Sequence, residues 1–201
     1  MTAESSQALA SLPAREGHFR LESGHHSDMW MDLEVLCLRP TTIKPLADQL
    51  AERLRPYALD VVCGPLNEGA FVALMVASAL GCQFTYAERI ANPTSSELFP
   101  VRYQVPRSLH KFIAGKRIGV VNDVTSAGSA VRGAYEDVQR IGGNVAVVGS
   151  LLVLGSGFQE WATGRTLPVE SLEDRPHRLW TPTECPLCAA NVRLEVSAAA
   201  Q

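Results

Sequence analysis

Cysteine, lysine and long apolar runs are scarce in this 201-residue sequence. Five cysteines are too few for a disulfide-stabilised scaffold, and an odd number leaves one unpaired, so we expect reduced thiols. No apolar run approaches the roughly 18 residues that a membrane span requires. The N-terminal segment has neither the basic region nor the apolar region of a secretory leader. These absences predict a cytoplasmic protein.

An excess of charge of one sign is also lacking. The 18 basic and 21 acidic residues give a net charge of −3, so there is no overall basic footprint for nucleic acid or for an anionic membrane. We therefore expect neither as a partner. Only three of the basic residues are lysines, namely Lys44, Lys111 and Lys116. With 46% hydrophobic residues the chain can form a sizeable core, which excludes a disordered or fibrous protein.

Apolar segments alternate with helical patterns along the middle of the chain. Continuous apolar or β-branched runs predict buried strands at residues 60–64, 84–88, 118–123 and 144–154. Apolar spacing and end signals predict helices at residues 42–55, 70–80 and 129–141. This order is typical of right-handed crossovers, and it predicts an α/β fold: a parallel twisted sheet with helices on both faces.

The length favours a single domain spanning residues 1–201. Its core is expected at about residues 41–155, and the irregular flanks, about 1–40 and 156–201, are expected to form a small hood over the sheet edge. Residues 89–117 are polar and without a clear period. A segment of this length inside a domain is a lid, a binding loop or a hairpin excursion.

The most informative segment is residues 119–132, where a buried strand ends in Asn122-Asp123 and a loop of small residues enters a helix. The backbone N–H groups of such a loop converge, the serine hydroxyls add donors, and the helix N-terminus favours negative charge. The segment therefore predicts a phosphate site, with Asp123 placed to accept hydrogen bonds from sugar hydroxyls. The alternative interpretation is an ordinary turn between strand and helix, where serine and glycine are common.

Four segments of the sequence resemble motifs of the type I phosphoribosyltransferases, and within that family those of the orotate branch, in the same order along the chain. Residues 126–130 (Ser-Ala-Gly-Ser-Ala) resemble the 5′-phosphate loop, after an acidic pair represented here by Asn122 and Asp123. Residues 17–32 resemble the N-terminal block, residues 63–69 the pyrophosphate loop, and residues 86–89 the entry to the catalytic flexible loop. The Cys-Pro-Leu-Cys tail at 185–188 resembles an extension that some members carry.

The resemblance implies the type I phosphoribosyltransferase fold and transfer of ribose 5-phosphate from phosphoribosyl pyrophosphate to a nucleobase, orotate by default, with Mg²⁺, in a homodimer. It also implies functional residues. The catalytic candidates are Asp123, Asn122 and Arg89. The phosphate-binding candidates are Thr125, Ser126, Ala127, Gly128, Ser129 and Ala130. The pyrophosphate-loop candidates are Pro65, Leu66, Asn67, Glu68 and Gly69. The base-pocket candidates are Phe19, Ser23, Gly24, His25 and Trp30.

Several residues depart from the pattern of that branch. Glu22, Glu68 and Glu88 stand where it has cations, and Asn122 replaces the first acid. A negative charge beside a phosphate is unfavourable by roughly 4 kcal/mol at about 4 Å when the effective dielectric is near 20. Two hypotheses follow: an active transferase, whose base need not be orotate, or a divergent member of the fold that binds a nucleotide or phosphoribosyl ligand in a regulatory role.

Cys185 and Cys188 are half of a zinc site. His177 and Cys37 are the only further ligand candidates that the sequence suggests, and their spacing is irregular, so we expect a plain turn and no protein-bound metal here. Two adjacent histidines, His25 and His26, either line the base pocket or are simply solvated. Trp30 either lies near the base or packs in the core.

Overall fold

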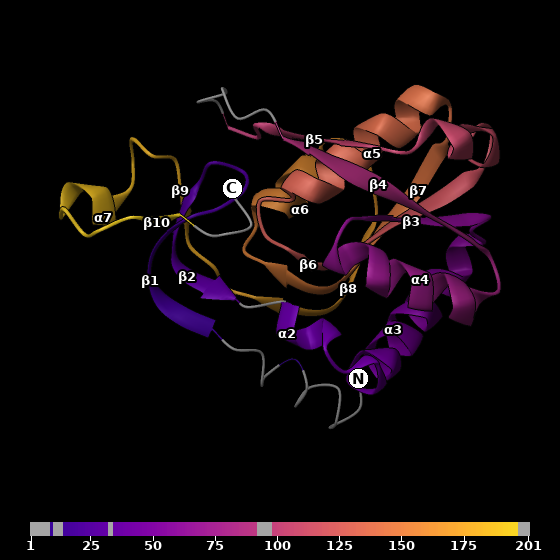
Figure 1. Ribbon diagram of the computed structural model, residues 1–201, viewed down its shortest axis with the longest axis horizontal. Coiled ribbons are helices and arrows are strands. Elements are labelled where there is room, and N and C mark those ends of the chain that lie inside the picture. Colours follow the sequence, from indigo (N-terminus) through magenta and orange to yellow (C-terminus); the bar gives the residue numbers. More distant parts are fainter. Residues whose placement is uncertain (1–8, 10–13, 32–33, 92–97, 197–201) are drawn as a thin grey trace.

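A mostly parallel six-stranded sheet forms the centre of the molecule (Figure 1). The computed structural model describes residues 9, 14–31, 34–91 and 98–196. The strand order is β5, β4, β3, β6, β7, β8, and only β5 runs antiparallel to its neighbour. The strands span Val61–Pro65 (β3), Gln83–Ala91 (β4), Val101–Gln104 (β5), Arg117–Thr125 (β6), Asn144–Leu154 (β7) and Val169–Arg175 (β8).

Helices cover both faces of this sheet (Figure 1), as the sequence predicts. One face packs against α3 (Pro40–Leu54) and α4 (Glu68–Leu80), and the other against α5 (Ser129–Ile141) and α6 (Gly157–Thr163). Successive residues alternate between the two cores: Val62 faces the first, whereas Val61 and Cys63 face the second. Because both faces are buried, the strands read as continuous apolar runs. The predicted α/β fold class is confirmed.

The strand order reverses at the centre of the sheet. From β3 the chain passes through α4 to β4 on one side, and it later returns to β6 on the other side of β3. The carboxyl ends of β3 and β6 therefore lie at a topological switch point, which is where α/β sheets bind ligands. Residues 65–69 begin at the last residue of β3, and residues 122–130 comprise the last four residues of β6 and the loop that leads into α5.

The described parts of residues 89–117 are arranged as a hairpin excursion, one of the three expected arrangements. Strand β4 extends to Ala91, β5 returns antiparallel to it, and a 3₁₀ helix at Arg107–Phe112 leads to β6. A second 3₁₀ helix, Arg55–Tyr57, follows α3. Residues 92–97, in the middle of the expected flexible loop, lie outside the described residues.

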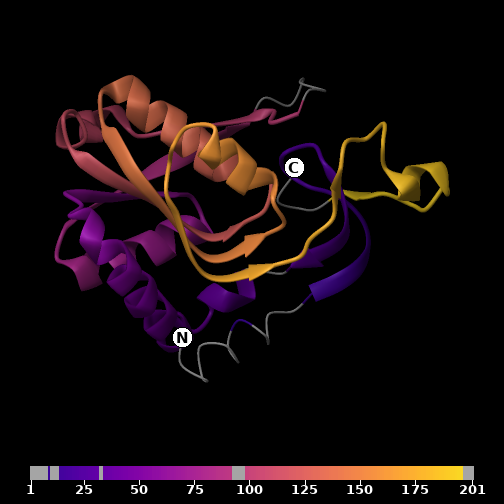
Figure 2. The same ribbon diagram turned by 180° about the vertical axis from the view of Figure 1, so that it is seen from behind.

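The hood is a separate four-stranded sheet in the order β10, β1, β2, β9. Its strands span Ala14–Arg20 (β1), His26–Met31 (β2), Leu179–Trp180 (β9) and Glu195–Val196 (β10), with the short helix α7 (Pro186–Ala189) between the last two. Another short helix, α2 (Glu34–Cys37), joins the hood to α3. Figure 2 shows the C-terminal segment passing from the core sheet to the hood. Both flanks of the chain thus build the hood, as expected.

The C-terminal part of the hood begins later in the sequence than the predicted residue 156. Residues 156–175 form α6 and β8, and β8 pairs in parallel with β7 as the edge strand of the core sheet. Among the described residues, no helix is long and apolar enough to cross a membrane.

Candidate functional site

A cavity of about 360 Å³ lies where the core sheet meets the hood. Part of its lining comes from the carboxyl ends of β3 and β6 and the loops after them, namely residues 65–69, 122–124 and 126–130. The hood contributes Arg15, residues 21–23 and residues 29–31, and Tyr103, Leu154 and His177 complete the wall. The cavity therefore joins the predicted phosphate loop, the predicted pyrophosphate loop and part of the N-terminal block.

The 126–130 loop is arranged to receive an anion. Gly128 adopts a left-handed conformation (φ 78°) and caps the N-terminus of the 13-residue helix α5. The hydroxyl oxygens of Ser126 and Ser129 are buried, and neither has a hydrogen-bond partner among the described residues. Buried hydroxyls without a partner are costly, and a helix N-terminus attracts negative charge. A phosphate would satisfy both hydroxyls and the helix dipole.

Thr125, the last residue of β6, does not line the cavity, unlike the residues before and after it. Its hydroxyl oxygen lies 2.5 Å from that of Ser150 on β7. Its contact therefore holds the end of β6 against the adjacent strand. A role for Thr125 in phosphate binding stays a prediction.

The Asn122-Asp123 pair lies beside this loop, facing the cavity. Asp123 is only 4% exposed, and this burial raises the pKa of its carboxyl to about 7. A backbone hydrogen bond from Val124 opposes the rise, and the negative charge of Glu68 adds to it. The side-chain amide of Asn122 donates a hydrogen bond to the Val124 carbonyl at 2.7 Å. Asp123 is thus a carboxyl group that changes charge near neutral pH.

The 65–69 loop packs closely against the Asn122-Asp123 pair. A Cβ atom on Gly69 would come within 2.1 Å of the Asn122 side-chain oxygen, so a larger residue there would displace the Asn122 amide. The preceding residue, Glu68, is the first residue of α4, and a carboxylate in the first turn of a helix is favourable. The Leu66–Asn67 peptide bond is cis. The two loops form a continuous polar floor.

Glu22 and Arg89 form an ion pair at the cavity wall. Arg89 Nε donates to a Glu22 carboxylate oxygen at 2.9 Å, and the Tyr103 hydroxyl donates to the same carboxylate at 3.1 Å. Burial, and then the charge of Glu22, raises the pKa of Tyr103 far above its usual range. The sequence did not indicate Tyr103, because the hairpin that carries it has no periodic pattern. Glu88, which precedes Arg89, is exposed and does not line the cavity.

The five base-pocket candidates divide into two groups. Ser23 and Trp30 line the cavity. Phe19 is buried inside the hood, with its ring centroid 6.2 Å from that of Trp30. Gly24 forms a tight turn with φ 82°, and His25 lies outside the cavity lining, with its ring nitrogen 3.0 Å from the Ser23 hydroxyl. The role of these residues in base binding stays a prediction.

The prediction that only His177 and Cys37 could complete a site with Cys185 and Cys188 is wrong. These cysteines lie with His18 and His26 in a cluster whose candidate ligand atoms are all within 4.8 Å of one another. His177, suggested from the sequence, lies instead with its Nε2 atom 3.2 Å from the Ser27 hydroxyl. Cys37 packs beside the core that α3 and α4 form. His26 is buried, so the interpretation of it as a solvated histidine is also wrong.

The cavity also holds donors that suit Mg²⁺. Glu68 and Asp123 bring two carboxylates to the same cavity, and the side chains of Asn67 and Asn122 lie beside them. Hard oxygen ligands of this kind are those that Mg²⁺ prefers. A cation here would relieve the repulsion between Glu68 and Asp123 that helps to raise the pKa of the latter.

Comparison with known proteins gives a consistent result. No model of a known protein family matches the sequence. An orotate phosphoribosyltransferase from Caldanaerobacter subterraneus is 30% identical over 179 residues, which cover 89% of this chain and 87% of that protein.

Solved structures show the same fold. An orotate phosphoribosyltransferase from Mycobacterium tuberculosis has a TM-score of 0.63 with 20% identity, covering 85% of this chain and 95% of that one. An adenine phosphoribosyltransferase from Thermoanaerobacter pseudethanolicus has a TM-score of 0.65 with 14% identity, covering 85% of this chain and 99% of that one. Transferases named for different bases thus share the fold.

Proposed function

The chain belongs to the orotate phosphoribosyltransferase family of type I phosphoribosyltransferases, and we propose that its cavity binds phosphoribosyl pyrophosphate together with a nucleobase, orotate by default. It is an orotate phosphoribosyltransferase-like enzyme of the pentosyltransferase class. A single domain with a hood, acting as a homodimer in the cytoplasm, is part of the same proposal and is supported by the family resemblance.

The observation that carries the proposal is the pair of buried serine hydroxyls at the N-terminus of α5. Ser126 and Ser129 have no partner among the described residues, and Gly128 between them admits a close approach of the backbone. A 5′-phosphate supplies the acceptor that these donors lack. Residues 126–130 would hold this group, with Thr125 supporting the loop from the end of β6.

Asp123 and Asn122 would position the sugar beside that phosphate. In its ionised form the Asp123 carboxylate accepts hydrogen bonds from vicinal hydroxyls, and Asn122 fixes the backbone next to it through the Val124 carbonyl. During transfer the bond between the anomeric carbon and the pyrophosphate oxygen breaks, and pyrophosphate leaves with the electron pair. A base nitrogen forms the new bond to that carbon and releases its proton to solvent. The contribution of these residues is to fix the reacting carbon in place.

Residues 65–69 would receive the pyrophosphate, with Glu68 and Asp123 as the carboxylates able to hold Mg²⁺. When bound, Mg²⁺ neutralises the charge of the leaving group. The family resemblance supports this assignment, and the close contact of Gly69 with Asn122 brings the two loops near enough to act on one ligand.

The Glu22–Arg89 ion pair favours the second candidate function, a divergent phosphoribosyltransferase-fold protein that binds a nucleotide or phosphoribosyl ligand in a regulatory role. Arg89 is the predicted catalytic cation, and its guanidinium is already paired with a carboxylate. The carboxylate of Glu22 also disfavours an anionic base such as orotate in its vicinity. The transferase reading is the main proposal because the relative of 30% identity spans almost the whole chain.

One experiment separates the two functions. Pyrophosphate release is measured with phosphoribosyl pyrophosphate, Mg²⁺ and a panel of nucleobases that includes orotate and neutral bases. Release with any base supports the transferase, and it should fall at least 100-fold in Asp123→Asn but not in Asp48→Asn, an aspartate on α3 whose side chain is 46% exposed and outside the cavity lining. Calorimetric binding of phosphoribosyl pyrophosphate without turnover supports the regulatory function. If neither turnover nor binding is detected at millimolar ligand, both functions are contradicted.

A further inference from the structure

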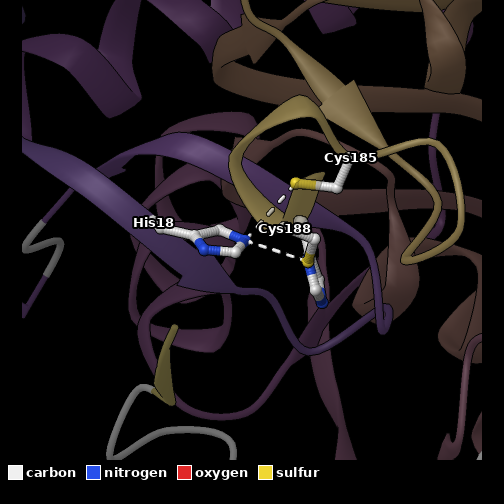
Figure 3. Close-up of side chains that lie close together, drawn as sticks. His18, Cys185 and Cys188 are labelled. Carbon is white, nitrogen blue, oxygen red and sulfur yellow. Dashed lines mark hydrogen bonds between the residues drawn. The ribbon is translucent and has the colours of Figure 1, made fainter. Parts of the chain in front are cut away.

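Four side chains of the hood converge on one point outside the cavity. His18 comes from β1, His26 from β2, and Cys185 and Cys188 from the start of α7. Figure 3 shows the two sulfur atoms facing Nε2 of His18. From this arrangement we propose that the protein binds one structural Zn²⁺ ion through these two histidines and two cysteines.

The distances fit tetrahedral zinc. His18 Nε2 lies 3.0 Å from His26 Nδ1, 3.4 Å from Cys185 Sγ and 3.7 Å from Cys188 Sγ, and Cys188 Sγ lies 3.2 Å from His26 Nδ1. With Zn–N bonds of about 2.0–2.1 Å and Zn–S bonds of about 2.3 Å, tetrahedral geometry separates ligand atoms by roughly 3.3–3.8 Å. Four of the six distances between the candidate ligand atoms are therefore close to those of a zinc coordination sphere, and the other two are at most 4.8 Å.

The hydrogen bonding of His18 selects its ligand atom. Its Nδ1 lies 2.9 Å from the backbone carbonyl oxygen of Val192, an atom that can only accept. Nδ1 therefore carries the proton, and Nε2 directs a lone pair into the cluster. A backbone carbonyl that orients a histidine in this way is typical of metal sites. The lone pair of Nε2 can accept one hydrogen bond, but three heteroatoms surround it. One cation shared by all four atoms would satisfy them better than hydrogen bonds among them.

The local fold explains why these residues meet. In the β1–β2 hairpin Arg20 pairs with His26, and His18 lies two residues before Arg20, at a register shift between Glu16 and Phe19. The hairpin thus brings the two histidine rings together, with His18 Nε2 3.0 Å from His26 Nδ1. His26 also pairs with Trp180 of β9, which leads the chain to the two cysteines. The cysteines have the two-residue spacing common in zinc sites, and both thiols are free. They enter the cluster from the opposite end of the chain.

The ion would be structural. Four protein ligands fill a tetrahedral zinc sphere and leave no open position for a substrate, and none of the four residues lines the cavity. Two thiolates and two neutral imidazoles also balance the charge of Zn²⁺. The ion would join β1, β2 and the C-terminal segment of a hood whose sheet has two strands of only two residues each. This inference does not depend on the proposed reaction.

Metal content is the first test. The full chain, purified without a metal-affinity step, is expected to contain about one zinc per chain by elemental mass spectrometry. Cys188→Ser, which changes an exposed residue, and His26→Ala should each lose most of this zinc. Cys82→Ser is the matched control because Cys82 lies outside the cluster, and it should keep its zinc. Equal zinc content in all variants, or none in the wild type even after zinc is added, overturns the proposal.

The second test uses only the wild-type chain, so it does not depend on whether a variant folds. After removal of metal with a chelator, Co²⁺ should give the absorption typical of tetrahedral thiolate coordination, and Zn²⁺ should abolish it with a Kd in the nanomolar range or below. Thermal unfolding should shift to lower temperature without metal and recover with Zn²⁺. Absorption typical of octahedral Co²⁺ would contradict the proposal. So would a count of three free thiols, in place of the five of the sequence, in the unfolded metal-free protein, because two cysteines would then form a disulfide.

Discussion

Arg89 Nε donates a hydrogen bond to Glu22 at 2.9 Å, and this ion pair joins the core sheet to the hood at the cavity wall. Both side chains are about a quarter exposed, so solvent screens the pair only in part. The Tyr103 hydroxyl contributes a further hydrogen bond to Glu22. One carboxylate thus holds the N-terminal block, β4 and β5 together, and it also places a negative charge in the lining of the cavity that contains the proposed phosphate site.

Replacing the Glu22 carboxylate tests how much its negative charge weakens ligand binding. Glu22→Gln should bind phosphoribosyl pyrophosphate about fivefold more tightly, because it removes a repulsion on the order of 1 kcal/mol between Glu22 and the ligand. Calorimetry checks this, with Glu16→Gln on the exposed part of β1 as the control. Weaker binding in Glu22→Gln would mean that the orientation of Arg89 matters more than the charge of Glu22.

The serine hydroxyls of the 126–130 loop give a second prediction. Ser126→Ala and Ser129→Ala should each weaken binding of ribose 5-phosphate roughly tenfold or more, because a hydrogen bond to a charged group contributes about 1.5–3 kcal/mol. The thermal stability of the free protein should not fall, because neither hydroxyl has a partner in it among the described residues. Calorimetry and a thermal-shift measurement together check both parts. Ser78→Ala, on the exposed side of α4, should change neither quantity. A variant that loses stability but keeps its affinity would refute the anion-site interpretation.

Gly128 provides a test of packing at the same helix terminus. Gly128→Ala should lower the free energy of unfolding by about 3 kcal/mol or more, because a Cβ atom there would lie 2.2 Å from the Phe158 ring. Gly142→Ala is the matched control: it has the same left-handed conformation at the other end of α5, with open space around it. That control should lose only about 1 kcal/mol. Urea denaturation measures both, and equal losses would remove the contact with Phe158 as the cause.

The raised pKa of Asp123 predicts opposite effects of pH on stability and on binding. Folding raises the pKa of this carboxyl from 3.8 to about 7, so the folded protein retains a proton that the unfolded chain has released between these pH values. The contribution of Asp123 to the free energy of unfolding therefore decreases as pH rises through this window, by on the order of 4 kcal/mol, and is constant above it. Affinity for sugar hydroxyls should instead increase through pH 7, because the ionised carboxylate is the acceptor.

The test compares wild type and Asp123→Asn in urea at several pH values. The variant should lack this part of the pH dependence, should be more stable than wild type at about pH 8, and should bind phosphoribosyl pyrophosphate weakly throughout. An unchanged pH profile of stability in the variant would assign the dependence to another group.

The core of the fold was predictable because its signals are local. Strands β3 and β7 and the first half of β6 are largely apolar runs, β4 is rich in apolar and aromatic residues, and the helices between them have regular apolar spacing and clear end signals. Strand β8 was missed because Val169–Arg175 alternates with charged residues, as an edge strand with one solvated face does. The hood sheet could not be paired from the sequence, because its strands come from opposite ends of the chain.

The candidate site shows the same division. Residues 122–130 were predictable because a strand, a polar pair and a small-residue loop are contiguous. Tyr103 was not, because it reaches the cavity from an aperiodic hairpin. The ligands that complete the Cys185–Cys188 pair were not predictable either: His18 and His26 lie more than 150 residues before the cysteines, and only the folded hood brings them together.

The architecture of the hood also fixes an order of events in folding. The contact between His18 and Val192 spans 174 residues of chain, and that between Ser27 and His177 spans 150. Contacts of such long sequence separation form late, because the entropy of closing the intervening loop is lost before they form. A chain emerging from the ribosome can therefore assemble the sheet strands β3 to β7 well before its hood. The cavity acquires His177, the last of its lining residues in the sequence, only after strands β3 to β7 have been synthesised, so a chain that stops at β7 lacks part of the wall around its ligand.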